Sequence, residues 1–187
     1  MISPLRPDDA RIERYVRDRA GVDPTTLPPA GSGPVPEGYH RLRAERTIGV
    51  DDDAFGRARE GLQAWAAHRG AGVEVFPADV APAVGLDVAI LTRQAGAWVL
   101  AACRVVRVVD DEERWGFTYA TLPGHPEDGY ESFTVARGED GVTFRVEAVS
   151  RPGALLVRLG GPVPSYLQRR MTVRYIDALE AYVDGGS

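Results

Sequence analysis

Lysine and asparagine are both absent from this chain of 187 residues, and Cys103 is its one cysteine. Without lysine the protein has no Schiff-base nucleophile and no P-loop lysine. A single cysteine excludes an internal disulfide and a cysteine-rich zinc site. The simplest reason for the missing lysine and asparagine is a GC-rich genome, which is a mutational bias rather than a function.

Histidine is also scarce: His40, His68 and His125 are the three present, and their spacing matches no metal-binding motif. We therefore expect neither a metal nor a cofactor. The 27 acidic residues outnumber the 22 arginines, and the resulting net charge of −5 argues against nucleic-acid and membrane-surface partners. The longest apolar stretch, Ala95–Arg107, is too short to span a bilayer. Because residues 1–10 lack a signal-peptide core, we expect a cytoplasmic protein.

Residues 1–38 are predicted to form an extension of the main domain. Residues 7–20 have the apolar spacing and the flanking Asp and Gly residues of a short helix. Residues 23–38 contain too much proline and glycine for a helix or a central strand, which is typical of a wrapping arm. We expect the compact domain to cover residues 39–187.

The compact domain is predicted to contain one strand, one helix, six further strands and a long final helix. Helical spacing covers residues 53–69 and 163–183. Period-two alternation and turn residues mark strands at residues 41–48, 73–76, 86–92, 97–109, 114–121, 130–136 and 142–150. This order indicates an α+β fold in which a curved antiparallel sheet of about six or seven strands wraps around the C-terminal helix. It resembles the helix-grip fold of lipid-transfer, polyketide-cyclase and pollen-allergen proteins.

Three segments carry a more specific resemblance. They read GYHRLRAERTIG at residues 38–49, CRVVRVVDDEERWGFTYATLPGHPEDGYESF at 103–133 and SRPGALLVRLGGPVPSYLQRRMTVRYIDAL at 150–179. Together they resemble the family called domain of unknown function nineteen-ninety, a resemblance that implies no activity, ligand or catalytic residue. Two positions depart from the family pattern. Ala120 follows Tyr119 where the family reads YGT, and Glu131 alone remains of an acidic pair.

Aromatic side chains on the predicted strands and final helix are candidates for lining a ligand cavity, although a filled core would use them equally well. The candidate ligand-binding residues are Trp98, Phe117, Tyr119, Phe133, Tyr166 and Tyr175, with Arg104 and His125 as polar contacts. Arg104 and Arg107 lie on opposite faces of their predicted strand, and whichever is buried needs a carboxylate, which either a glutamate on a strand (Glu45, Glu131 or Glu147) or the ligand supplies. We expect a small apolar or aromatic ligand, with or without a carboxylate group.

His125 lies in the turn LPGHPEDGYE at residues 122–131, near Glu127 and Glu131 in sequence. A histidine beside carboxylates can act as a general base, which predicts catalytic roles for these three residues. The alternative is a structural turn in which His125 bonds a backbone carbonyl or faces water. His68, near the end of a predicted helix, is interpreted as a partner of the helix dipole.

Three functions stay open at this point. The first is binding of a small ligand in a cavity between the sheet and the C-terminal helix. The second is a cofactor-independent cyclase, dehydratase or hydrolase in which His125 is the general base. The third is a protein-interaction module, which predicts a solid core and an exposed apolar patch.

Overall fold

The computed structural model describes residues 1–26, 34–94, 96–153 and 165–185, with the backbone alone at residues 165–167. Its elements in chain order are β1 (Ile2–Ser3), α1 (Asp9–Arg17), β2 (His40–Gly49), α2 (Ala54–Gln63), α3 (Ala66–Gly70), β3 (Val73–Phe76), β4 (Asp87–Gln94), β5 (Ala97–Asp110), β6 (Arg114–Thr121), β7 (Glu127–Gly138), β8 (Gly141–Pro152) and α5 (Ser165–Val183). No helix within these ranges is long and apolar enough to cross a bilayer.

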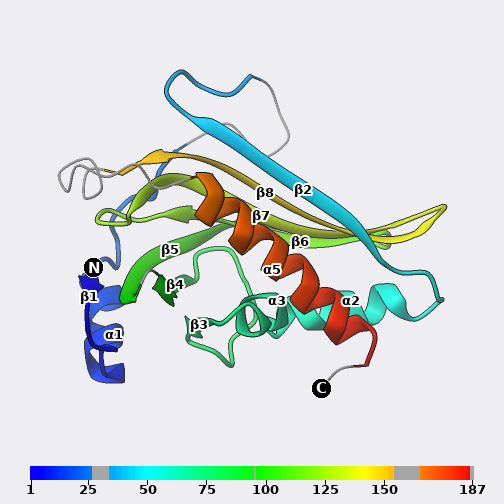
Figure 1. Ribbon diagram of the computed structural model, residues 1–187, viewed down its shortest axis with the longest axis horizontal. Helices are drawn as coiled ribbons and strands as arrows, with labels where there is room; N and C mark the ends of the chain where they lie inside the picture. The colour runs from blue at the N-terminus through cyan, green and yellow to red at the C-terminus, as the bar shows by residue number, and fades with distance from the viewer. Residues whose placement is uncertain (27–33, 95, 154–164, 186–187) are drawn as a thin grey trace.

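Seven strands form one antiparallel sheet in the order β2-β8-β7-β6-β5-β4-β3, and the short β1 pairs with β5. Figure 1 shows this sheet curving around α5, which crosses its concave face. The predicted curved antiparallel sheet around a C-terminal helix is therefore confirmed. The pattern analysis missed β1 because a strand of two residues is too short to show alternation.

Strand alternation sends the large apolar side chains to the concave face. On β6, Trp115, Phe117 and Tyr119 belong to the main core, while Thr118 between them belongs to the opposite face. The core is completed by Phe133 from β7, further strand residues and the apolar faces of α2, α3 and α5. Its most buried aromatic side chains include Trp65, Phe117, Phe133 and Phe144.

The helix predicted over residues 53–69 is interrupted at Trp65, which separates α2 from α3. Trp65 has left-handed backbone geometry, with φ of 59°, and its side chain is 1% exposed. The indole N–H donates to the carbonyl of Val80 at 2.9 Å. Burial of the ring and this hydrogen bond offset the strain of a left-handed residue. The apolar spacing of residues 53–69 therefore continues across Trp65, although the chain forms two helices there instead of one.

Two glycines allow α5 to pack closely on α2 and α3. A Cβ at Gly70 would lie 2.6 Å from the Cβ of Ala178, and one at Gly61 would lie 2.7 Å from the ring of Tyr182. Both distances are shorter than any real side-chain contact, so these positions require glycine. The C-terminal half of α5 is thereby held against α2 and α3.

The N-terminal segment packs on the sheet face opposite the main core. Ile12 of α1 is fully buried against Ala89, Leu91 and Leu100. Farther along the chain, Thr25 donates its backbone N–H to the carbonyl of Thr121 at 2.9 Å. Val35 and Tyr39 pack on a second outer cluster of Ala120, Tyr130 and Val149. The described parts of the arm therefore fold back onto their own domain.

Replacement of Phe133 by alanine tests whether the aromatic cluster supports the fold. The ring is fully buried and lies 4.7 Å from the ring of His68 and 5.2 Å from that of Phe117, measured between centroids. We expect Phe133→Ala to lower the free energy of unfolding by about 3–5 kcal/mol in urea denaturation. The control Val106→Ala, at a side chain that is 40% exposed on β5, should change it by less than about 0.5 kcal/mol.

Candidate functional site

A pocket of about 420 Å³ separates the concave face of the sheet from the first half of α5; we call it the inner pocket. Residues from all eight strands and from the β6–β7 connection form its walls, and Gln168, Met171, Thr172 and Tyr175 of α5 close it. The apolar part of the lining includes Leu42, Val73, Ile90, Val99, Ala101, Cys103 and Ala148. Apolar walls with a few polar groups are typical of small-molecule sites.

A chain of three polar side chains leads from the core to the inner pocket. The hydroxyl of Tyr119 donates to Oε2 of Glu131 at 2.6 Å, and Nε2 of His68 lies 3.5 Å from the Tyr119 oxygen. Tyr119 has one proton and uses it on Glu131, so His68 acts as the donor when Nε2 carries the hydrogen. The pKa of Glu131 is raised to about 7, chiefly by burial and also by the negative charge of Glu127, against the lowering effect of the Tyr119 hydrogen bond.

His68 is fully buried among aromatic rings, and its Nδ1 has no hydrogen-bond partner among the described residues. The rings of Phe133 and Tyr175 lie 4.7 and 4.9 Å from the imidazole, between centroids. This apolar surrounding disfavours the charged form and lowers the pKa of His68 to about 3. The imidazole is therefore neutral near pH 7, so it does not stabilise the helix dipole as a cation, and that sequence-based interpretation was wrong.

Glu127 lies on the same face of β7 as Glu131, because β7 begins three residues earlier than its sequence pattern predicts. Its Oε2 accepts from the Ser150 hydroxyl at 2.9 Å, and its Oε1 accepts from the Gln168 side chain at 2.7 Å. Burial raises the pKa of this carboxyl group as well. Both oxygens are thus used to join β7, β8 and α5.

His125 lines the inner pocket, but its ring also holds the turn in place. Nδ1 lies 2.9 Å from both the backbone N and the backbone O of Glu127. Burial lowers the pKa of His125 to about 4, so the imidazole is neutral and weakly basic near pH 7. The arrangement matches the structural alternative of the sequence analysis more closely than a general base, whose pKa would lie near the working pH.

The structure brings some of the sequence-predicted site residues together and separates others. Those that line the inner pocket are Tyr119, His125, Glu127, Glu131 and Tyr175. Phe117 and Phe133 lie in the closed core behind Tyr119. Trp98 packs with the cluster around Ile12, on the other face of the sheet. The side chain of Tyr166 lies outside the described residues.

Arg104 is not part of the described pocket lining. Its guanidinium binds the carboxylate of Asp87 with Nε and Nη2, at 2.6 and 2.9 Å, and donates to the carbonyl of Val22 at 3.0 Å. Asp87 is the residue directly opposite Arg104 in the β4–β5 register. The needed carboxylate is thus a strand neighbour that the sequence analysis did not consider.

Sequence reasoning also missed His68, Ser150 and Gln168. His68 was interpreted as a partner of the helix dipole, and its position in the sequence does not reveal which strand residue it meets. Ser150 is at the end of β8 and Gln168 is in the first turn of α5. Only the fold brings these two side chains to Glu127. Within the described residues, no group of three His, Cys, Asp or Glu side chains has a metal-binding arrangement.

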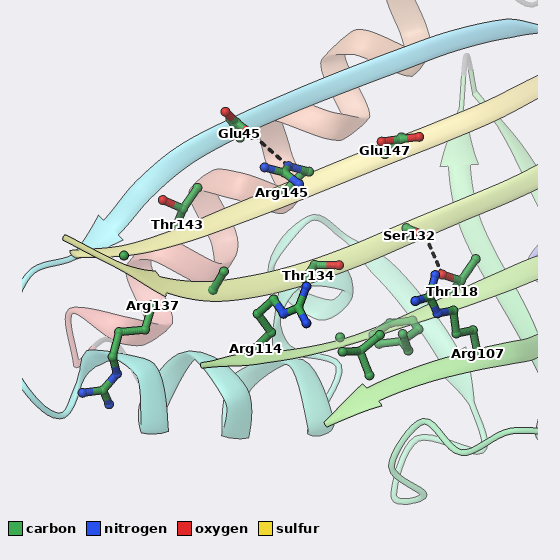
Figure 2. A pocket seen from close by; sticks show the side chains of 15 residues that line it. Glu45, Arg107, Arg114, Thr118, Ser132, Thr134, Arg137, Thr143, Arg145 and Glu147 are labelled. Carbon is green, nitrogen blue, oxygen red and sulfur yellow. Dashed lines mark hydrogen bonds and ion pairs between the residues drawn. The ribbon is translucent and has the colours of Figure 1, made fainter. Parts of the chain in front are cut away.

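A second hollow, of about 360 Å³, lies on the opposite face of the sheet; we call it the outer hollow. Figure 2 shows it with α5 behind the strands. Its polar groups bond one another: Arg145 donates to Glu45 at 2.7 Å, and the hydroxyls of Thr118 and Ser132 share a hydrogen bond. The lining of the inner pocket is more apolar than that of the outer hollow, which is typical of small-molecule sites, so we take the inner pocket as the candidate functional site.

A model of the family described as "Domain of unknown function (DUF1990)" matches residues 25–178. A UPF0548 protein from Dictyostelium discoideum is 26% identical over 192 residues, which cover 90% of this chain and 89% of that protein. A UPF0548 protein from Deinococcus radiodurans is 35% identical over 100 residues, or 49% of this chain and 50% of that protein.

Solved structures with the same fold share little sequence with this chain. Ara h 8.0201 has a TM-score of 0.52 at 12% identity, with 79% of this chain and 99% of that one covered. A hypothetical protein from Helicobacter pylori has a TM-score of 0.54 at 11% identity, with 84% and 99% covered. The di-domain ARO/CYC StfQ of the steffimycin biosynthetic pathway has a TM-score of 0.52 at 11% identity, with 79% and 51% covered. These likenesses show the helix-grip fold that the element order predicted.

The buried neutral state of His68 predicts a specific pH dependence of stability. Between its ordinary pKa of 6.5 and its folded pKa of about 3, the unfolded chain binds a proton that the folded chain does not. The free energy of unfolding therefore falls as the pH falls through this window. His68→Phe keeps a ring among the aromatic neighbours and removes the titrating group. Relative to wild type, we expect it to gain about 1–2 kcal/mol between pH 7.5 and pH 5 in urea denaturation.

The control for this measurement is His40→Phe, at an exposed position. It should keep the pH dependence of the wild type. His125 contributes a similar dependence of its own, so His68→Phe should lose part of the slope and not all of it. An unchanged slope in His68→Phe would contradict neutral burial of this imidazole.

Proposed function

The chain belongs to the DUF1990 family, and we propose that it binds a small, largely apolar molecule in the inner pocket between the sheet and α5. The observation that carries this proposal is the pocket itself, because a filled core would have left no such space. Its volume of about 420 Å³ is within the range of about 300–1,000 Å³ that is usual for small-molecule sites.

The walls of the inner pocket favour an apolar occupant. Val99, Ala101 and Cys103 of β5 form one wall, and Met171 of α5 lies among the lining residues from the helix. A ligand that covers these side chains removes apolar surface from water, worth roughly 25 cal/mol per Å². The solid core expected of a protein-interaction module does not account for this pocket, so we favour ligand binding over that alternative.

Catalysis is the second candidate function, with Glu131 in place of His125 as the general base. A base that works near neutral pH needs a pKa close to 7, which favours Glu131 over His125. Glu131 also has Tyr119 as a hydrogen-bonding neighbour inside the pocket. The ARO/CYC protein StfQ shares the fold. At 11% identity this likeness concerns the fold alone and assigns no reaction to this chain.

Filling the inner pocket with a large side chain should abolish binding of an apolar probe. We expect Val99→Trp to weaken binding of N-phenyl-1-naphthylamine at least about tenfold, because the indole would occupy the space that the probe needs. Fluorescence enhancement of the probe measures the affinity. Native mass spectrometry of the freshly purified wild type should show additional mass that is lost on denaturation.

Val106→Trp is the matched control, since Val106 lies on the same strand with its side chain 40% exposed. It should bind the probe like the wild type. Equal affinity of both variants, with both folded by circular dichroism, would place the probe outside the inner pocket and count against the proposal.

A further inference from the structure

We infer that the ligand of the inner pocket carries a hydroxyl or amine group that donates a hydrogen bond to Glu131, and that it carries no carboxylate at this end. The inference rests on the proposed function and adds the chemical class of the ligand's polar group. It is carried by the hydrogen-bonding state of the two pocket carboxylates and by the position of the arginines.

The two pocket carboxylates, Glu127 and Glu131, differ in how many of their oxygens have a hydrogen-bond donor. Both oxygens of Glu127 have donors in the protein, from Ser150 and Gln168. Glu131 differs, because Tyr119 donates to Oε2 and no other described side chain donates to this carboxylate. Among the described residues, Oε1 of Glu131 therefore has no donor, and this residue lines the pocket. An apolar ligand without a donor would leave it unpaired, which costs free energy in a site that excludes water.

Tyr119 is a positioning residue that holds the carboxylate of Glu131. Its single hydroxyl proton is used on Glu131, so Tyr119 has no proton left for the ligand. His68 lies behind this hydroxyl, with Nε2 3.5 Å from its oxygen, and aromatic rings hold the imidazole in place. The carboxylate is thus held from one side, and its open oxygen is presented to the ligand.

The charge of the inner pocket disfavours a ligand that carries a carboxylate. No arginine is among the described residues of the inner pocket lining, and Arg104 is occupied by Asp87. A ligand carboxylate would therefore meet Glu131 and Glu127 with no cation to offset the repulsion in a partly desolvated site. The expectation of a carboxylate-bearing ligand depended on Arg104 facing the cavity, and this geometry removes its basis.

Protonation of Glu131 should reverse the preference. The titratable groups that face it come from four elements: Tyr119 of β6, Cys103 of β5, Tyr175 of α5 and Glu127 of β7, with His68 of α3 behind Tyr119. Of these, Glu127 is the one whose negative charge raises the pKa of Glu131. Because Oε2 accepts from Tyr119, an added proton is placed on Oε1 and turns it from an acceptor into a donor. As the pH falls through about 7, donor ligands should bind less tightly and carboxylates more tightly.

A set of naphthalene derivatives with one shared apolar body tests the inference. Naphthalene reports the apolar pocket alone, 2-naphthol and 2-naphthylmethylamine carry a donor, and 2-naphthoate carries a carboxylate. Titration calorimetry at pH 8 should show the two donor compounds binding at least about tenfold more tightly than 2-naphthoate. Glu131→Gln should reduce this ratio about tenfold or more, whereas Glu139→Gln, at an exposed turn, should leave every affinity unchanged.

The naphthalene measurement separates the two levels of the argument. If none of the compounds binds the wild type, the proposed function itself fails. If naphthalene binds but the ratio is the same in wild type and Glu131→Gln, ligand binding stands and the role of Glu131 is overturned. Lowering the pH from 8 to 6 in the wild type is a test that needs no variant. It should lower the ratio of 2-naphthol to 2-naphthoate affinity, and a constant ratio would also overturn the inference.

Discussion

The close contact of α5 with two glycines is the constraint on which the rest of the molecule depends. Gly61 and Gly70 let α2 and α3 approach the C-terminal half of the helix at distances that no other residue permits. That half is packed against apolar residues such as Leu179 and Val183, which are almost fully buried. Toward its N-terminal end, α5 meets the pocket lining instead of α2 and α3. One end of the helix is therefore fixed by packing, while the other forms a wall of a cavity. A ligand that binds there need not open the core, because the aromatic cluster around Phe133 is complete without it.

The polar groups at the pocket and behind it differ in how many hydrogen bonds each makes with neighbouring side chains. Glu127 has a donor for each oxygen and joins two strands to the helix, so its role is structural. Glu131 has a single side-chain donor in the described parts of the chain, so the hydrogen bonding of this carboxylate is incomplete there. His68 has a nitrogen without a partner, but it is sealed in the core, where a small molecule does not reach it. Two incompletely bonded groups thus lie at opposite ends of one chain through Tyr119. The carboxylate end belongs to the pocket lining, so on the proposed function it is the end that a ligand meets.

The sequence predicted the architecture well because strand alternation and helical periodicity are local signals. The residue ranges of six of the seven main strands follow from period two, to within a few residues at their ends. β7 shows where local signals fail: proline and glycine at residues 122–129 indicate a long turn, yet Glu127 already pairs with Pro152. The candidate site was predicted less completely than the strands, because His125 and Arg104 were chosen for their residue type and their neighbours in the sequence. Asp87 meets Arg104 only through the β4–β5 register, and His68 meets Tyr119 only through the packing of α3 on the sheet. Such contacts join residues 17 and 51 positions apart, and no pattern within one element encodes them.

Because the chain has no lysine, every permanently charged cationic side chain in it is an arginine. Arginine remains protonated in proteins, so a buried arginine always demands a counter-charge. In the described parts of the chain its ion pairs include Arg46 with Glu180, Arg57 with Asp51 and Arg145 with Glu45, all substantially exposed, where such pairs contribute about 0–1 kcal/mol. The pocket instead contains glutamate, tyrosine and histidine, groups that can each be neutral. On the proposed function, recognition inside the pocket therefore depends on groups that accept or release a proton, as Glu131 does, and not on an arginine.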